Sequence, residues 1–227
     1  VGGNYEVTKV DNFLKSSEAL VNHFTALIKS QEVDGKPKQF WGKYVAWFGP
    51  IGYKYSGKSH DQADMNDKTL LHMARRAEKV NGMPEGYYNS ALLNIFPEGK
   101  GIGAHTDNEV ELRDEDGNVG SIAVVTLGGT SKIDIVDNDT GTVVNSVEAA
   151  DGSMYTMPSG DFQHKYKHAV GGSDKERISI TFRHIPENNI KQSGGGLGAT
   201  YPGGGYANVE MSREELLAVE KANNEFI

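Results

Sequence analysis

The hydrophobic pattern of the first third of the chain predicts two amphipathic helices. The first begins behind Ser16 and Ser17, which are helix-capping residue types, and its apolar positions have helical spacing: Leu20, Phe24, Leu27 and Ile28. The second covers about residues 67–80, carries leucines and alanines on one side, and ends at Asn81-Gly82. The segment between these helices, FWGKYVAWFGPIGYKYSG, is rich in aromatic residues and follows neither the helical nor the strand period.

From Tyr87 onward the pattern changes to short apolar runs typical of strands. These runs are separated by Gly, Asp and Asn, with no helical pattern between them: YYNSALLNIF, GSIAVVTLG, SKIDIV, GTVVNSV, GSMYTM, HKYKHAV and RISITFRHI. Such a series predicts a mainly β fold of the sandwich or jelly-roll type. After it, a glycine-rich segment at residues 193–206 predicts a linker, and Ser212 and Glu215 form a capping box in front of a short terminal helix.

The composition limits the kinds of site that this chain can build. Its 227 residues contain no cysteine, which excludes disulfides, zinc fingers and a thiolate nucleophile. A metal ion would therefore need His, Asp or Glu ligands. The chain has no signal-peptide pattern and no apolar run of membrane-spanning length, so we expect a soluble, intracellular protein without membrane contact. A start at Val1 suggests trimming, a tag scar or excision from a longer polypeptide.

The charge is unevenly distributed along the chain. The net charge is −8, which argues against long-range attraction of nucleic acid. Residues 1–100 carry 13 basic and 11 acidic side chains, however, whereas residues 101–227 carry 10 and 20. The N-terminal part is thus the better place for contact with a polyanion.

A metal site is predicted around His105 and Asp107. These residues lie two apart after a glycine-rich turn, so on an extended strand both side chains face the same way. A third ligand would complete a 2-His-1-carboxylate triad, which suits Fe(II) with open coordination positions. His164 and His168 are the candidates, and His168 is preferred because it begins an apolar step toward the core. The alternative is a hydrogen-bonded turn at His105 with the later histidines at the surface.

The run Arg177–Arg183 predicts a strand with one polar and one apolar face. Arg177, Ser179 and Arg183 share the polar face with Thr181, while the intervening positions are apolar. If the arginines point inward they need anionic partners, because an unpaired buried charge is costly. A dicarboxylate would supply them, since Arg binds carboxylates bidentately. The alternative is an exposed strand face with solvated arginines.

These motifs together resemble the AlkB family of Fe(II)- and 2-oxoglutarate-dependent dioxygenases, which are nucleic-acid demethylases. The similarity covers about residues 40–186 and rests on four motifs in the family's order: YYNSALLNIF, HTDNE, HAV and RISITFR. The resemblance implies a double-stranded β-helix, or jelly roll, with flanking N-terminal helices and an N-terminal lid. It divides the chain into helices and lid (1–86), dioxygenase core (87–186), and linker with terminal helix (187–227).

The resemblance also implies roles for individual residues. His105, Asp107 and His168 would bind Fe(II), and the 2-oxoglutarate site would contain Asn94, Phe96, Tyr155, Arg177, Ser179 and Arg183. In this set Arg177 and Ser179 serve the distal carboxylate, while Asn94 and Arg183 serve the chelating end. Phe96 replaces the family's usual tyrosine and loses a hydroxyl group, for which Tyr155 could substitute. Ser179 stands where many members have Asn.

The aromatic segment resembles the family's nucleotide-recognition lid. The substrate residues implied by this resemblance are Trp47, Phe48, Tyr53 and Tyr55, together with Glu109 close to the target base. Aromatic faces offset the cost of unstacking a base. For Trp41 we expect a structural position instead, among the core and edge residues of an N-terminal extension of the sheet, because large aromatic side chains are mostly packed.

The implied activity is oxidative demethylation of bases such as 1-methyladenine and 3-methylcytosine in RNA or DNA, using Fe(II), 2-oxoglutarate and O2. It would release formaldehyde, succinate and CO2. The expected partner is methylated single-stranded RNA or DNA, bound by a monomeric core in the cytoplasm, or in the host cytoplasm if a virus encodes the chain. The acidic loop at residues 109–118 favours an alternative, a 2-oxoglutarate-dependent hydroxylase of a protein side chain or small molecule. A non-catalytic binding module is the third possibility.

Overall fold

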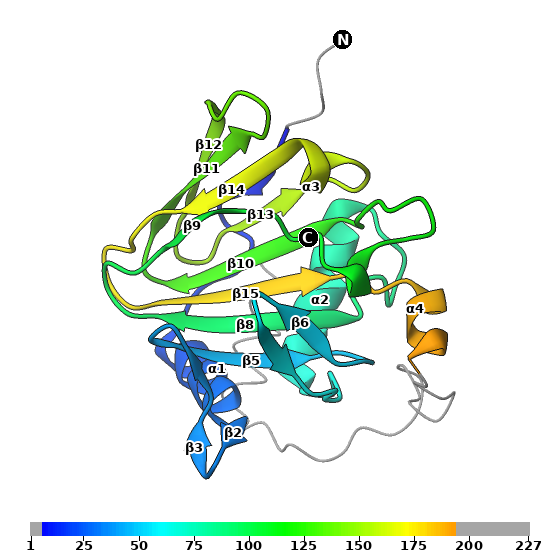
Figure 1. Ribbon diagram of the computed structural model, residues 1–227. Coiled ribbons are helices and arrows are strands. Elements are labelled where there is room, and N and C mark those ends of the chain that lie inside the picture. Colours follow the sequence, from blue (N-terminus) through cyan, green and yellow to red (C-terminus); the bar gives the residue numbers. More distant parts are fainter. Residues whose placement is uncertain (1–5, 194–227) are drawn as a thin grey trace.

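The fold is built on two facing β-sheets, of which the larger has seven strands. A computed structural model describes residues 6–193 of the chain. The larger sheet has the strand order β1-β13-β10-β15-β8-β5-β4 and is antiparallel throughout (Figure 1). Its strands, in chain order, are β1 (Thr8–Val10), β4 (Gln39–Phe40), β5 (Lys43–Phe48), β8 (Ser90–Phe96), β10 (Ile122–Gly128), β13 (Met154–Met157) and β15 (Arg177–Arg183).

The smaller sheet faces the larger one and has the order β12-β11-β14-β9. Its strands are β9 (Ile102–His105), β11 (Ser131–Asp137), β12 (Val143–Ala149) and β14 (Tyr166–Val170). Two short hairpins stand outside both sheets, β2 (Glu32–Val33) with β3 (Lys36–Pro37) and β6 (Tyr53–Tyr55) with β7 (Lys58–His60). The two facing antiparallel sheets confirm the predicted mainly β, jelly-roll fold, a double-stranded β-helix.

Both predicted N-terminal helices are present and capped as expected. Helix α1 (Glu18–Lys29) begins behind Ser17, whose hydroxyl accepts a hydrogen bond from the backbone N–H of Leu20. Helix α2 (Lys68–Asn81) begins behind Asp67 and ends at Gly82, which adopts the left-handed conformation with φ of 66°. Both helices pack against the same face of the larger sheet, the face directed away from the smaller sheet (Figure 1).

Two hydrophobic cores result from this layering. The outer core lies between the helices and the larger sheet and includes Ile178, Ile180 and Phe182 of β15. The inner core lies between the two sheets and includes Val45 and Val124. The strand β15 therefore has the two faces that its alternation predicts, and its arginine-bearing face is directed into the interior between the sheets.

Several segments differ from the sequence-based expectation. The aromatic segment without clear periodicity forms β4 to β7, and β5 pairs directly with β8, so this segment is continuous with the core sheet. The first two residues of the run HKYKHAV end a short helix, α3 (Phe162–Lys165), and its last five residues form β14. Helix α4 (Glu187–Gln192) occupies the start of the predicted C-terminal segment, residues 187–227. From residue 194 on, the predicted linker and the terminal helix at Ser212 and Glu215 lie outside the described residues.

Within residues 6–193, no helix is both long enough and apolar enough to cross a membrane.

Candidate metal centre and binding pocket

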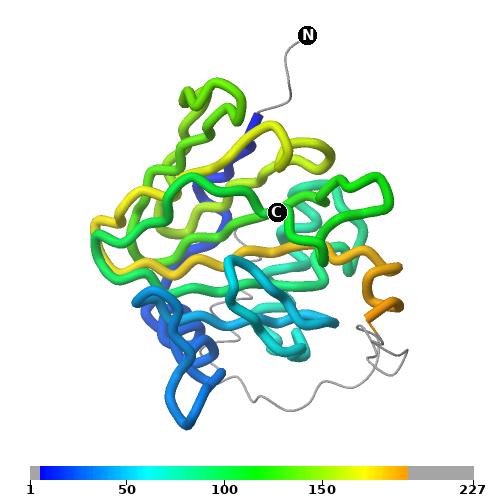
Figure 2. The backbone as a smooth tube through the Cα atoms, in the orientation of Figure 1, coloured from blue at the N-terminus to red at the C-terminus, as the bar shows by residue number. Residues whose placement is uncertain are grey.

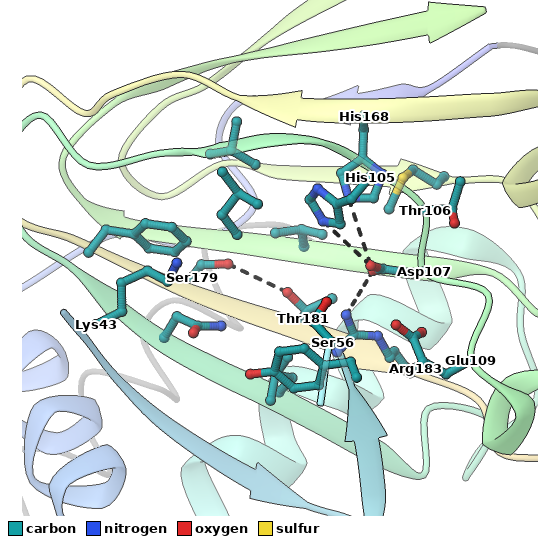
Figure 3. Close-up of a pocket in the computed structure, with 18 of the residues that line it drawn as sticks. Lys43, Ser56, His105, Thr106, Asp107, Glu109, His168, Ser179, Thr181 and Arg183 are labelled. Atoms are coloured by element: carbon teal, nitrogen blue, oxygen red, sulfur yellow. Dashed lines mark hydrogen bonds and ion pairs between the residues drawn. The ribbon is translucent and has the colours of Figure 1, made fainter. Parts of the chain in front are cut away.

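A pocket of about 930 Å³, its open mouth included, lies between the two sheets at one end of the jelly roll. Figure 3 shows His105, Asp107 and His168 grouped on one side of it, with Lys43 and Ser179 at the opposite end. All the site residues predicted from the sequence line this pocket except Trp47 and Phe48. Those lining it are Tyr53, Tyr55, Asn94, Phe96, His105, Asp107, Glu109, Tyr155, His168, Arg177, Ser179 and Arg183.

The two histidines of the predicted metal set meet because their strands are neighbours. In the ladder between β9 and β14, His105 lies directly opposite His168, and their ring centroids are 4.2 Å apart. The Nδ1 atom of His105 lies 2.8 Å from the carbonyl oxygen of Gly103. A carbonyl can only accept, so Nδ1 carries the proton and Nε2 is left free for a metal.

Asp107 lies two residues beyond the end of β9 and is held there by two contacts. Its backbone N–H donates to the side-chain oxygen of Gln163 at 2.9 Å, and Arg183 Nη2 donates to its Oδ2 atom at 2.7 Å. The other oxygen, Oδ1, lies 3.6 Å from Nε2 of His105 and 4.0 Å from Nε2 of His168. One ligand atom from each of the three residues thus lies within 4.8 Å of the others.

The electrostatic surroundings keep Asp107 and His168 in the protonation states that metal binding needs. Burial alone would raise the pKa of the Asp107 carboxyl, but the charge of Arg183, with those of His168 and His105, holds it well below its usual range. Burial lowers the pKa of His168 to about 4, and the charges of His105 and Arg183 lower it further. The carboxylate of Asp107 raises this pKa, but its effect is smaller than that of burial. At neutral pH the site offers a carboxylate and a neutral imidazole.

The two alternatives for the third ligand are clearly separated in space. His168 is buried beside Asp107, whereas His164 lies in α3 with Nε2 2.6 Å from the carbonyl oxygen of Gly117. Gln163, its neighbour in α3, is a positioning residue that the sequence did not reveal. Nothing in the sequence near Gln163 marks it, because its role depends on α3 reaching the loop that carries Asp107.

Arg177 is a buried cation without an anionic partner among the described residues. It is 1% exposed, its Nη2 atom donates to Thr126 Oγ1 at 3.2 Å, and its Nε atom has no hydrogen-bond partner. Burial lowers the pKa of Arg177 against the opposing effect of Tyr155. Such a group is costly unless a ligand supplies the negative charge. It fits the carboxylate of a dicarboxylate cosubstrate.

Arg183 lies at the metal end of the same strand and retains free donors. One of its nitrogens is taken by Asp107, while Nε and Nη1 have no hydrogen-bond partner. Between the two arginines, Ser179 lies opposite Asn94 in the β15–β8 ladder, and both line the pocket. The donor set therefore extends from the metal group to Arg177, which fits a metal chelated by a keto acid whose second carboxylate lies farther along the strand.

Trp47 and Phe48, predicted as lid residues, are packed in the two cores. Trp47 is fully buried, its indole N–H donates to the carbonyl of Ile51 at 2.9 Å, and its ring stacks on Tyr53 with centroids 4.4 Å apart. Phe48 alternates to the opposite face of β5 and packs in the outer core. Neither side chain lines the pocket. Trp47 supports the β6–β7 hairpin by stacking on Tyr53.

Trp41 lies at the edge of the larger sheet, one of the two structural positions expected for it, but its side chain is not packed. Trp41 is 56% exposed and lines the pocket mouth. It occupies the tight turn between β4 and β5 and has a positive φ of 51°. The Trp41-Gly42 pair between two short strands was the available signal, since glycine at such a position commonly marks a turn. Trp41 and Tyr55 together supply exposed and half-buried aromatic faces at the mouth.

Glu109 lies at the same side of the pocket as Asp107. The hydroxyl of Tyr53 donates to its Oε2 atom at 2.7 Å. Burial and the charge of Asp107 raise the pKa of Glu109, although Arg183 and the bond from Tyr53 oppose this shift. Glu109 thus links the β6–β7 hairpin to the loop that carries Asp107.

Comparison with known proteins supports the reading of this pocket. A family model described as the 2OG-Fe(II) oxygenase superfamily matches residues 9–183. The RNA replication polyprotein of Blueberry scorch virus is 30% identical over 170 residues, covering 70% of this chain and 7% of the polyprotein. The RNA replication polyprotein of Citrus leaf blotch virus is 34% identical over 104 residues, covering 45% and 5%. The chain thus corresponds to a small fraction of these relatives.

The fold also has a counterpart among solved structures. The structure of OsALKBH1 superposes with a TM-score of 0.57 at 13% sequence identity, covering 78% of this chain and 97% of that chain. This similarity bears on the fold, which is the jelly roll of AlkB-like proteins. Together with the family match over most of the chain, it places this protein in the 2OG-Fe(II) oxygenase superfamily, with an AlkB-like fold and with Fe(II), 2-oxoglutarate and O2 as its cofactors.

Proposed function

We propose that this protein oxidatively demethylates alkylated bases of the 1-methyladenine and 3-methylcytosine type in single-stranded nucleic acid. The observation that carries the proposal is that Trp41 and Tyr55, two aromatic side chains with accessible faces, line the same pocket as His105 and Asp107. A planar base can stack on such faces while its methyl group points toward the metal.

Each part of the site has a role in this reaction. His105, Asp107 and His168 hold the metal, and the arginines of β15 hold the two ends of the cosubstrate. When bound, Fe(II), 2-oxoglutarate and O2 supply the oxidising power, with 2-oxoglutarate converted to succinate and CO2. Hydroxylation of an N-methyl carbon then releases formaldehyde and the repaired base. The buried walls between the sheets exclude water from the reacting methyl group.

RNA is the substrate that we favour over DNA. The two curated relatives are RNA replication polyproteins, which makes a role on RNA within a longer polypeptide the consistent reading. The direct test is a mass-spectrometric panel with 1-methyladenine and 3-methylcytosine in matched RNA and DNA oligonucleotides, with Fe(II) and 2-oxoglutarate present. Loss of methyl groups with equimolar succinate supports the proposal. Absence of demethylation on every oligonucleotide would overturn it.

The metal assignment has its own test. His105→Ala removes one of three ligands, so succinate formation in the presence of a methylated oligonucleotide should fall to background. His72→Ala, at an exposed position on α2, is the matched control and should retain full turnover. Retained succinate formation by His105→Ala would contradict the assignment of the ligand set.

A hydroxylase of a protein side chain or small molecule is the second candidate function. The feature that favours it is the acidic loop beside the pocket, where Glu109 and exposed Asp114, Glu115 and Asp116 repel phosphate groups. Trp41→Ala discriminates between the two functions, because a lost stacking face should weaken oligonucleotide binding about fivefold to a hundredfold. Trp41→Phe should retain most of the affinity. Unchanged oligonucleotide affinity in Trp41→Ala would favour the hydroxylase.

A further inference from the structure

The end of the pocket farthest from the metal group carries two cations and no acidic partner among the described residues. Arg177 is one of them. The other is Lys43, at the start of β5, which is 9% exposed and lines the pocket. Within residues 6–193, neither side chain makes an ion pair with a carboxylate, whereas Arg183 at the metal end is paired with Asp107.

The strand register directs Lys43 into the pocket. In the β5–β8 ladder, Val45 lies opposite Asn94, and Val45 packs in the inner core. Lys43 is two residues before Val45, so its side chain shares the same inward face. Figure 3 shows it extending into the pocket toward Ser179, on the side away from Asp107.

The ring of Phe96 lies close to both cations. The Nζ atom of Lys43 lies 5.4 Å from the centroid of the Phe96 ring, and the guanidinium carbon of Arg177 lies 5.3 Å from the same centroid. A phenylalanine offers no hydrogen-bond donor to an anion bound there. Burial and the charge of Lys100 lower the pKa of the Lys43 ammonium, which indicates that its charge lacks compensation from within the chain.

We propose that Lys43 binds the distal carboxylate of 2-oxoglutarate together with Arg177, providing the donor that Phe96 cannot. The ammonium and the guanidinium approach the anion from β5 and β15, two strands on either side of β8 in the larger sheet. The two positive charges are then compensated by the cosubstrate, and the site selects a keto acid that ends in a second carboxylate. This inference rests on cosubstrate binding, which the proposed function requires, and it is independent of the substrate's identity.

Isothermal titration calorimetry of the Mn(II)-loaded protein, without nucleic acid or Fe(II), tests the proposal. The two probes are 2-oxoglutarate and 2-oxopentanoate, which share the keto-acid end and differ in the distal carboxylate. Lys43→Met should bind 2-oxoglutarate at least tenfold more weakly, the loss of a charge-assisted hydrogen bond, and should bind 2-oxopentanoate like the wild type. Lys43→Arg should remain within about threefold for both probes.

The matched control is Lys58→Met. The Nζ atoms of Lys43 and Lys58 lie 5.7 Å and 5.6 Å from the centroid of the Trp41 ring, but Lys58 does not line the pocket. This variant should leave both affinities unchanged. In the Lys43→Met background, Phe96→Tyr should restore part of the lost affinity for 2-oxoglutarate alone, because the phenol adds a donor at the same place.

Two results would overturn the proposal. One is wild-type affinity of Lys43→Met for 2-oxoglutarate, and the other is an equal loss for both probes, which would indicate a structural role. If Lys43→Met fails to fold, the comparison of the two probes on Lys43→Gln decides between the same outcomes. Because no oligonucleotide is present, a failed demethylation assay and a failed role for Lys43 are separate findings.

Discussion

The two tryptophans of the chain differ sharply in exposure, since Trp47 is fully buried and Trp41 is mostly exposed. Trp41 and Trp47 are six positions apart in the same aromatic segment, and composition cannot distinguish them. Strand alternation and the turn at Gly42 place Trp47 in the core and Trp41 at the pocket mouth. The sequence predicted Trp47 as a lid residue and Trp41 as a packed structural residue, whereas Trp47 is buried and Trp41 is exposed at the edge of the sheet. The short strands of the segment have no clear periodicity from which burial could be predicted.

This difference predicts opposite effects of the same substitution. Trp47→Ala removes a fully buried ring, its stacking on Tyr53 and a hydrogen bond to Ile51, so it should lower the free energy of unfolding by about 3–5 kcal/mol. Trp41→Ala at the exposed turn should change it by less than about 0.5 kcal/mol. Urea unfolding of both variants measures this. Similar destabilisation by the two substitutions would contradict the placement of Trp41.

Elements with clear alternation were predictable, and elements that depend on distant partners were not. The polar and apolar faces of β15 follow from seven residues of sequence, which is why Arg177, Ser179 and Arg183 could be expected inside. The pairing of His168 with His105 depends on β14 lying beside β9, which no local pattern specifies. The hairpin of β6 and β7 is likewise a tertiary feature, placed over the pocket by its contacts with Glu109 and Glu111.

That hairpin should make the protein sensitive to acid through His60. Burial, with Lys38 and Arg183, lowers the pKa of His60 to about 3, and its Nδ1 atom accepts from the Lys38 ammonium at 3.1 Å. The unfolded chain takes up this proton near pH 6.5 and the native state does not, so stability falls as the pH drops from 6.5 toward 3. The loss is at most about 1.4 kcal/mol per pH unit, or about 2 kcal/mol by pH 5.

The measurement is urea unfolding of the metal-free protein at pH 7 and pH 5. His60→Gln should lose less stability between these two values than the wild type, since other titrating groups contribute equally to both. His72→Gln, on the exposed face of α2, is the control and should behave like the wild type. An identical pH dependence in His60→Gln and the wild type would exclude His60 as the cause.

At the scale of the whole molecule, the two sheets position the pocket residues, and the charge distribution places acidic side chains in a loop beside the pocket. The jelly roll fixes the metal group and the β15 arginines in one interior, which the motifs predicted jointly although each motif alone is weak. The loop at residues 109–118 lies beside the β6–β7 hairpin and α4 (Figure 2). The side chain of Glu111 accepts a hydrogen bond from the backbone N–H of Lys54, and the side-chain amide of Asn189 donates to the carbonyls of Glu111 and Arg113. Glu109 of this loop lines the pocket, and Asp114, Glu115 and Asp116 lie beside the residues of α4.

This placement predicts that the loop limits polynucleotide affinity. Replacing Glu115 and Asp116 by Gln and Asn should raise affinity for a single-stranded RNA several-fold at low salt, and the gain should shrink as salt is added, because the Debye length falls from about 30 Å at 0.01 M to about 10 Å at 0.1 M. The control pair, Asp139→Asn with Glu148→Gln, removes the same charge from the exposed β11–β12 hairpin. Fluorescence anisotropy at several salt concentrations distinguishes the two pairs. An equal gain from both would show that net charge governs binding, whereas a gain specific to the loop shows that charge near the pocket does.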